Sequence, residues 1–551
     1  MTTRDYLQGK STDGYEFFGP HIKDKGYIFR VLAPEAEEVF LIGDFNDWKK
    51  TPMRRYKTGV FSLTDNKAKV GDRYQYLIKT DKEEVKKIDP FARSIIYEDD
   101  SSEIIDDTYK FKNKKTNKVP KNILQVHLGS LFKQDKDSRT IFEELIKYAK
   151  VFNYTTIYLM PINEYQNYKS MGYAPLSLFS YSKRYGSIKD FKDFVDKAHK
   201  NNIGVIAEID ISEFDGDKKG LIKFDGSDIY NYQYDDILYN NYGSVNFDIS
   251  EDMAKSYVKS AIGMYLDAYK LDGVSFPDID NVIYWQGESS RGINNKWCDF
   301  LKELIELIKD KKSLALASFN GYSGDIDLDF DMIFDNRSKT LVNLISDLPI
   351  NRENYKHHIY NILESSTSEN ILGFSFADST TNEASLAMKI YSDDKKAKQE
   401  KGLLTFLYTQ KSPKILFMGD DRGDLKTFSI YEAFDPNNIE NSLEDVEAYY
   451  KDLSHLYLST KALNDRESSI ELLDIEGYSL YAYKRAYKNE EYLVVINFTD
   501  IDYQINSPYN LEEVLNIDDL KYHGSGNVNG KVSKGEEINI EAFGTGIFKI
   551  L

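Results

Sequence analysis

The sequence contains one cysteine, Cys298, among its 551 residues, which excludes an intramolecular disulfide and a metal cluster held by several cysteines. It also lacks any apolar run near the roughly 20 residues that a membrane-spanning helix needs, so we expect no membrane partner. The N-terminal residues show no basic segment followed by an apolar one, the pattern of a signal peptide. Together these absences predict a cytoplasmic protein.

Positive charge is scarce beside negative charge, since 71 lysine and arginine residues stand against 90 aspartate and glutamate residues and the net charge is -19. Because the phosphates of a nucleic acid would be repelled, we expect no nucleic-acid partner, whereas a neutral sugar would not be repelled. The seven histidines form no cluster with the spacing of metal ligands. The sequence therefore predicts no metal and no other cofactor.

Hydrophobic periodicity divides the chain into several parts, as a chain of this length requires. Residues 1–20 are polar and predict a loosely held N-terminal arm. Residues 21–112 alternate short strands with Gly, Asp and Asn, the pattern of a small β-sandwich. Residues 460–551 return to alternating strands, which predicts a second β-sandwich at the C-terminus.

Between these parts, residues 120–455 alternate strands and helices, and the strands are nearly continuously apolar, as parallel strands buried on both faces should be. This pattern predicts an α/β fold with a (β/α)8 TIM barrel. The strands that we expect are ILQVHLG, TTIYLMP, IGVIAEIDI, DGVSF, SLALASF, ILGFSFAD and PKILFMG. Chemistry in such barrels lies at the carboxyl ends of the strands, so the segment PDIDNVIY, which follows DGVSF, should decide the function.

Several motifs of the chain are similar to those of one known family. In the family's order and spacing, the chain carries FRVLAPEAEEVFLIGDFNDW, KIDPFA, QVHLGS, MGYAPLSLFSYSKRYGSIKDF, PKILFMG and LVVINF. On these motifs it resembles the 1,4-α-glucan (glycogen) branching enzymes of the α-amylase superfamily, glycoside hydrolase family 13. The resemblance covers nearly the whole chain from residue 26. It implies a TIM barrel flanked by an N-terminal, Ig-like module of carbohydrate-binding family 48 and by a C-terminal all-β domain.

The resemblance also implies catalytic residues that this chain does not have. The family's nucleophilic aspartate falls on Pro277, and the arginine beside it falls on Ser275. The general acid falls on Ser318, and the histidine of a third motif falls on Ala377. We therefore predict a divergent member that is catalytically inactive, a pseudoenzyme.

Two carboxylates remain near these positions. Asp378 keeps the aspartate of the third motif. Asp278 lies one residue beyond the nucleophile position and, because side chains alternate along a strand, we expect it to face the helix layer or a loop. A slip of one residue in the alignment would instead make Asp278 the nucleophile. After Ser318 the next carboxylate is Asp325.

Five residues are candidates for substrate binding. Tyr173 matches a family tyrosine that stacks on the sugar, and packing at the barrel mouth explains it equally well. Glu208 and Glu213 replace the family's aspartate and histidine. Trp48 is a candidate sugar platform on the small sandwich, although core packing explains it more simply. Asp378 completes the set, although a lone aspartate of this kind is more often a hydrogen-bonding residue of the fold than a catalyst.

Three functions stay open from the sequence. The one it favours is a protein that binds α-glucan, as glycogen or maltooligosaccharide, or a partner, without glycosyl transfer. The second is an active branching enzyme or amylase-type glycosidase whose rearranged site uses Asp278, Asp378 and Glu208 or Glu213. The third is a scaffold or regulatory subunit that binds a protein partner and no sugar. Loss of both nucleophile and general acid weighs against the second, because these groups act as a unit.

Overall fold

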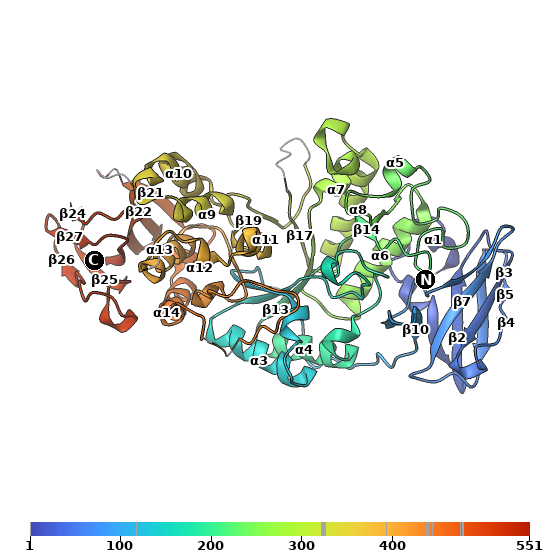
Figure 1. Ribbon diagram of the computed structural model, residues 1–551. Coiled ribbons are helices and arrows are strands. Elements are labelled where there is room, and N and C mark those ends of the chain that lie inside the picture. The colour runs from blue at the N-terminus through green and yellow to red at the C-terminus, as the bar shows by residue number, and fades with distance from the viewer. Residues whose placement is uncertain are drawn as a thin grey trace. The chain divides into compact units, whose positions relative to one another are not determined.

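The computed structural model describes residues 2–116, 118–320, 327–392, 394–436, 438, 440–443, 445–473, 475 and 479–551. Figure 1 shows the chain with its helices and strands labelled. By its contacts the chain divides into two compact units. The first consists of Met1–Asn117, His127–Phe142 and Leu159–Asp331, and the second of Lys118–Val126, Glu143–Tyr158 and Met332–Leu551. The domain limits predicted from the sequence follow a different division, and they stay predictions.

The N-terminal strands form two sheets that face each other. One sheet has the order β1 (Gly19–Lys23), β2 (Gly26–Leu32), β6 (Val60–Asp65), β5 (Arg54–Arg55). The other has the order β4 (Thr51–Pro52), β3 (Glu38–Gly43), β7 (Arg73–Lys79), β10 (Ser101–Glu103), β9 (Ile95–Ile96), with β8 (Glu84–Lys87) paired to β7. Phe29 of β2 packs on Tyr74 of β7, with ring centroids 5.0 Å apart. Aromatic burial between the sheets therefore forms the core of this sandwich.

Eight parallel strands in the described part of the chain close into one barrel. Their order is β11 (Asn122–Val126), β12 (Thr156–Leu159), β13 (Gly204–Glu208), β16 (Gly273–Phe276), β17 (Leu314–Ala317), β18 (Met332–Phe334), β19 (Asn370–Phe374), β20 (Lys414–Phe417). The first and last strands pair in parallel from Asn122 with Lys414 to Gln125 with Phe417, as closure requires. The predicted fold class, a TIM barrel between two β domains, is confirmed.

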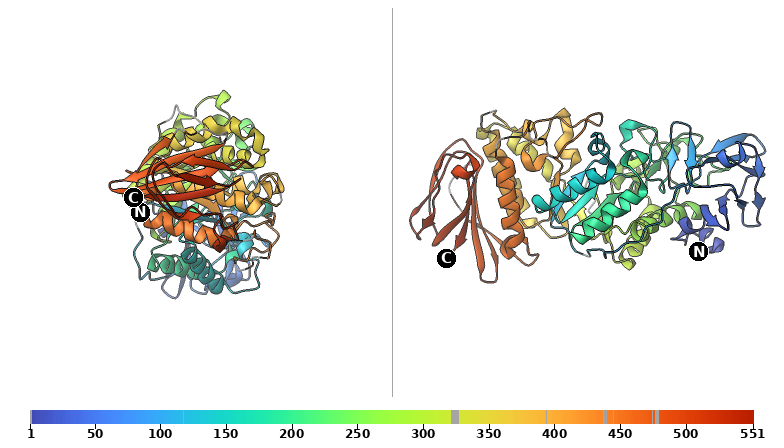
Figure 2. Two further views of the ribbon diagram at one scale, coloured as in Figure 1. Left: turned by 90° about the vertical axis from the view of Figure 1, so that its left-hand side faces the viewer. Right: turned by 90° about the horizontal axis from the view of Figure 1, so that it is seen from below.

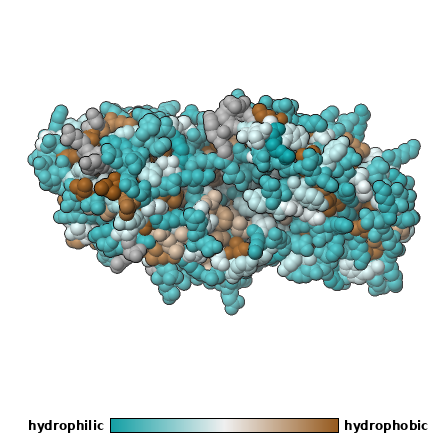
Figure 3. All heavy atoms as spheres, turned by 45° about the horizontal axis from the view of Figure 1, so that its top comes forward, coloured by the Kyte–Doolittle hydropathy of each residue, from teal (hydrophilic) through white to brown (hydrophobic). Residues whose placement is uncertain are grey.

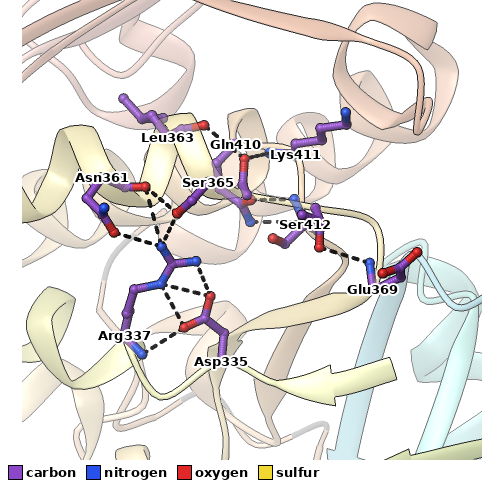
Figure 4. A network of polar contacts seen from close by, with 11 residues as sticks. Asp335, Arg337, Asn361, Leu363, Ser365, Glu369, Gln410, Lys411 and Ser412 are labelled. Atoms are coloured by element: carbon purple, nitrogen blue, oxygen red, sulfur yellow. Dashed lines mark hydrogen bonds and ion pairs between the residues drawn. The ribbon is translucent and has the colours of Figure 1, made fainter. Parts of the chain in front are cut away.

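Helices follow most of these strands along the chain, in the βα alternation that the sequence predicts. The longer ones are α3 (Ser138–Val151), α4 (Ile188–Lys200), α6 (Asp252–Asp267), α8 (Asn295–Asp310), α9 (Ser338–Ser346), α10 (Lys356–Ser365), α13 (Lys396–Thr409) and α14 (Val446–Ser459). Figure 4 shows how the loop after β18 is fastened to α10. Arg337 binds the Asp335 carboxylate, with Nε 2.9 Å from Oδ1, and also reaches the Asn361 side chain at 3.1 Å. Such polar ties hold the connecting loops in place.

The C-terminal strands form a second sandwich, seen as two red layers in Figure 2. The larger sheet has the order β21 (Ser469–Leu473), β22 (Leu480–Tyr487), β23 (Glu490–Asn497), β28 (Thr545–Ile550), β25 (Leu511–Asn516), β26 (Lys531–Val532), and the smaller pairs β24 (Tyr503–Asn506) with β27 (Glu537–Ile540). Leu493 and Phe548 of the larger sheet and Ile538 of the smaller share one buried core cluster. The alternation of apolar residues along these strands produces that shared core.

The surface agrees with the acidic, charged composition. Hydrophilic residues dominate the face drawn in Figure 3, with hydrophobic residues in small, scattered groups. Among the described residues, no helix has both the length and the apolar character needed to cross a membrane.

The N-terminal residues are not loosely held, which corrects the prediction made from their polarity. Tyr6 is fully buried, and its ring lies 4.8 Å from that of Phe18. The backbone is also fastened to α6, because the Gly14 N–H donates to Ser260 Oγ at 3.0 Å and Ser256 Oγ donates to the Tyr6 carbonyl at 2.7 Å. The few aromatic residues of this segment supply the burial that its average polarity conceals.

The buried ring gives a test of this packing. Replacing Tyr6 by alanine should lower the free energy of unfolding by about 3 kcal/mol, because a filled aromatic site becomes a cavity. The change should appear as a lower apparent Tm and as faster hydrogen exchange in the first turns of α6. Ile22→Ala, at a side chain that is 72% exposed, serves as the control and should leave both measurements unchanged. Equal behaviour of the two variants would contradict the packing.

Candidate functional site

The ends of β16 and β17 carry the positions at which the resemblance to the family predicts that catalytic groups are missing. Ser275 is fully buried in β16, and its Oγ has no hydrogen-bond partner among the described residues. Pro277, which is half-buried, begins the turn that leaves the strand. Ser318 follows β17 directly and is also half-buried. None of these three side chains is a carboxylate or a strong acid.

Hydrogen bonds join the two strand ends to each other. The Ser318 N–H donates to the Phe276 carbonyl at 3.0 Å, and the Asp278 N–H donates to Ser318 Oγ at 2.9 Å. The Ile279 N–H donates to the Ser318 carbonyl at 3.0 Å. The serine at the general-acid position thus serves as an anchor for the turn that contains the nucleophile position.

Asp278 lies in this turn and not in the strand. The strand ends at Phe276, and Asp278 has a left-handed φ of 44°. The predicted orientation of Asp278 rests on the alternation of side chains along a strand. That alternation ends with the strand and therefore does not apply to Asp278. Its charge adds to the rise in the pKa of Asp210, which burial raises to about 7. The two carboxyl groups are therefore electrostatic neighbours.

Two predicted substrate-binding residues contact each other at the end of β13. Glu208 is buried, and it accepts a hydrogen bond of 2.5 Å from the hydroxyl of half-buried Tyr173. This bond fixes the tilt of the tyrosine ring. The bond is compatible with packing at the barrel mouth and with stacking on a sugar, because a sugar platform also needs a fixed ring.

Glu213 and Asp210 form a buried acidic pair just beyond β13. Burial, with a contribution from the Asp210 carboxylate, raises the pKa of Glu213 to about 9. Asp210 accepts from the Ser212 N–H at 2.8 Å and from the Ser212 hydroxyl at 2.5 Å. Near neutral pH Glu213 therefore keeps its proton and can donate a hydrogen bond. The sequence analysis did not identify Asp210, although its spacing of two from Glu208 in a strand-like segment was a usable signal.

Asp378, in the second compact unit, has a structural role at the start of α11 (Phe376–Thr380). It accepts from the Ser375 N–H at 3.1 Å and the Ser375 hydroxyl at 2.9 Å, which makes a capping box. It also accepts from Ser338 Oγ at 3.0 Å. Ala377 beside it is exposed. These bonds match the prediction that Asp378 is a hydrogen-bonding residue of the fold.

Trp48, in the N-terminal sandwich, is held by polar contacts. Its indole N–H donates to Asp44 at 2.9 Å, and the Arg73 guanidinium lies 5.8 Å from its ring centroid. The ring is half-buried. Partial burial is compatible with core packing, the simpler explanation from the sequence, and with a sugar platform, so both stay predictions.

No metal-binding arrangement is found in the part of the chain that the structure describes, where no group of three or more His, Cys, Asp or Glu side chains could hold an ion. Asp325, the first carboxylate after Ser318, lies outside the described residues.

The neutral state of Glu213 gives a pH test. Between about pH 4.5 and pH 9 the unfolded chain releases this proton while the folded chain keeps it, so stability should fall by roughly 1.4 kcal/mol per pH unit as pH rises. Glu213→Gln, which is neutral at every pH, should therefore have a higher apparent Tm than the wild type at pH 8 and a similar one at pH 5. Exposed Glu288→Gln is the control. A Tm difference that does not change with pH would contradict the neutral state.

Comparisons with known proteins show what the chain is similar to. A model of carbohydrate-binding module 48 (isoamylase N-terminal domain) matches residues 17–92, and one of the α-amylase C-terminal all-β domain matches residues 473–550. The 1,4-α-glucan branching enzyme GlgB of Fusobacterium nucleatum is 27% identical over 94% of this chain and 92% of that protein. The same enzyme of Clostridium perfringens is 28% identical over 95% and 89%.

Solved structures agree on the fold. The catalytic module of the glycogen-degrading pneumococcal virulence factor SpuA covers all of this chain with a TM-score of 0.74 and 16% identity, and 99% of that module is covered. The GBS pullulanase SAP in complex with maltotetraose gives 0.75 and 15% identity, with 100% of this chain and 89% of that one covered. At such identities these structures establish the fold alone. Along nearly its whole length the chain is thus similar to the 1,4-α-glucan branching enzymes of the α-amylase superfamily, and its two terminal β regions match domain models of carbohydrate-active enzymes.

Proposed function

We propose that this chain is a branching-enzyme-like protein of α-glucan metabolism that binds α-glucan in the cytoplasm and transfers no glycosyl group. The observation that carries the proposal is the junction of β16 and β17. There, Pro277 stands at the nucleophile position, and Ser318, at the position of the general acid, bonds the turn that follows the proline. The similarity to branching enzymes along nearly the whole chain supports α-glucan as the ligand.

The chemistry of retaining glycosyl transfer explains why these two positions matter. It requires two carboxyl groups about 5 to 5.5 Å apart, one that attacks the sugar and one that protonates the leaving oxygen. Proline offers no nucleophilic oxygen. A serine hydroxyl is far too weak an acid to protonate a leaving group near neutral pH. Because the two groups act as a unit, the loss of either removes most of the catalysis.

One observation favours a second candidate function, an active enzyme with a rearranged site. Asp278 and Asp210 are electrostatic neighbours, and burial raises the pKa of Asp210 to about 7. Glycosidases use two neighbouring carboxyl groups, one as nucleophile and one as acid, and a raised pKa suits the acid. In this alternative Asp278 attacks and Asp210 supplies the proton.

Assays of the purified protein separate the two candidates. We expect no branching of amylose by iodine staining, no release of reducing ends, and no covalent trapping by an activated fluoro-sugar between pH 5 and pH 9. Pro277→Asp should also be inactive, because the general acid would still be missing. A GlgB relative with activity provides the positive control. Turnover by the wild type that Asp278→Asn abolishes would overturn the proposal in favour of the rearranged site.

Affinity electrophoresis in glycogen gels tests the binding half of the proposal. The wild type should be retarded, and Trp48→Ala and Tyr173→Ala should each weaken the retardation by a few fold, because several weak contacts add along one glucan chain. Tyr173→Phe keeps the ring and removes only the bond to Glu208, so it should bind like the wild type if the ring stacks on sugar. Unretarded migration of the wild type would exclude glycogen as the ligand and favour a protein partner.

A further inference from the structure

Three segments of the second compact unit meet at a buried cation. The first, residues 345–353, runs from the end of α9 into the 3-10 helix Pro349–Tyr355. The second contains Tyr391, two residues after α12 (Leu386–Lys389), and the third, residues 498–502, connects β23 to β24. The cation is Arg352, which is fully buried. Its Nη1 donates to the Phe498 carbonyl at 2.9 Å, which ties the first segment to the third.

Tyr391, in the second segment, is held by the same cation. The Ile345 carbonyl accepts from Arg352 Nη2 at 3.1 Å and from the Tyr391 N–H at 2.9 Å. The side chain of Gln399 makes a second link, because its Oε1 accepts from Arg352 at 2.7 Å and its Nε2 donates to the Tyr391 carbonyl at 2.6 Å. One hydrogen-bond network thus joins the backbones of the three segments. Exposed side chains on these segments are therefore neighbours on the surface.

Large apolar side chains are exposed on all three segments. The exposed fractions are 84% for Ile350, 47% for Ile501, 45% for Leu348 and 41% for Tyr391. We call these four residues the Ile350 patch. Exposed apolar residues that are scattered singly need no explanation, but four on segments joined through one buried residue form a group, and such a group marks a contact surface.

The charge beside the Ile350 patch has one sign. The charged residues of segments 345–353 and 498–502 are Asp347, Arg352, Glu353, Asp500 and Asp502. Arg352 is fully buried, whereas Glu353, Asp500 and Asp502 are exposed. Burial lowers the pKa of Arg352 to about 10, which the charges of Asp347 and Asp500 oppose, so Arg352 stays protonated at neutral pH. At the surface, these two segments therefore present apolar side chains with an acidic border.

The acidic border decides which occupant fits. Charges across an interface select a partner of opposite sign, whereas apolar contacts supply much of the affinity. A second copy of the chain, which also carries a net charge of -19, would bring the same carboxylates face to face across a two-fold axis. An anionic membrane surface would be repelled in the same way. A segment whose apolar side chains are flanked by lysine and arginine matches both features, and a basic amphipathic helix combines them in one element.

We propose that the Ile350 patch is a docking surface for a basic amphipathic helix of a partner protein. The apolar face of that helix covers Ile350 and Ile501, and its flanking cations pair with the exposed carboxylates of the border. Because the Arg352 network already fixes the three segments, binding requires little ordering of this chain. The proposal goes beyond glucan binding and does not depend on it.

A synthetic helix of about 18 residues, with leucine on one face and lysine on the other, is a suitable probe. Fluorescence anisotropy of the labelled peptide should show saturable binding to the wild type. Ile350→Ser and Ile501→Ser should each weaken that binding by about fivefold or more, as expected for central apolar contacts. Leu520→Ser, at a leucine of the same unit that is 71% exposed, is the matched control and should bind like the wild type.

The charge of the border is tested separately. Asp500→Asn should weaken binding of the peptide by a few fold, and added salt should weaken it further by screening the remaining carboxylates. A peptide with glutamate in place of lysine keeps the apolar face and should not bind, because its charge has the sign of the border.

The remaining outcomes would overturn the proposal. Absence of binding to the wild type would do so, as would equal binding by the wild type, Ile350→Ser and Ile501→Ser, since the peptide would then be held by the general negative charge of the chain. Sedimentation velocity provides a further check. Self-association of the wild type that Ile350→Ser abolishes would make a second copy the occupant and overturn the choice of a basic helix.

Discussion

Closure of the parallel sheet is the constraint on which the remaining structure depends. Pairing of β11 with β20 closes the barrel and brings the carboxyl ends of its strands to one rim. The turn at Pro277 begins at the end of β16, and the Ser318 anchor begins at the end of β17. At the end of β13, Glu208 binds Tyr173 and the insert of residues 209–251 begins. The barrel thus determines where function can lie, and the residues placed there determine what the function is.

The residues that match the family motifs are largely ones that hold the fold. Asp272 accepts from His199 at 2.8 Å and from the Val205 N–H at 2.8 Å, which ties α4 to β13 and β16. Asp89, in the KIDPFA motif, accepts from the hydroxyls of Tyr74 and Tyr76. Removing any of these carboxylates would leave buried donors unpaired. Of the positions predicted to be catalytic, Ser275 makes no such side-chain bond among the described residues, whereas Ser318 Oγ anchors the turn after β16.

The sequence predicts much of the fold because periodicity is a local property. It identifies seven of the eight described barrel strands and misses β18, whose three apolar residues stand between Asp331 and Asp335 and are too few to show a period. It also indicates Tyr173 and Glu208 separately, although not the bond between them. Ile350 and Ile501 could not be grouped from the sequence, because they come from segments about 150 residues apart that meet only in the folded chain, at Arg352.

The pairing of substitutions at Ser275 and Pro277 has an electrostatic reason. Ser275 is fully buried, so an arginine there would need a carboxylate partner at the strand end to offset its desolvation. Once position 277 carries no charge, a buried guanidinium at 275 would be strongly destabilising, whereas a serine leaves only one hydroxyl unpaired, at a cost of about 1–3 kcal/mol. The reverse also holds, because an aspartate restored at 277 alone would lack the cation that keeps it ionised. Under the proposed function, the absence of the nucleophile and the absence of the arginine are therefore coupled, and catalysis would require both residues together with an acid at position 318.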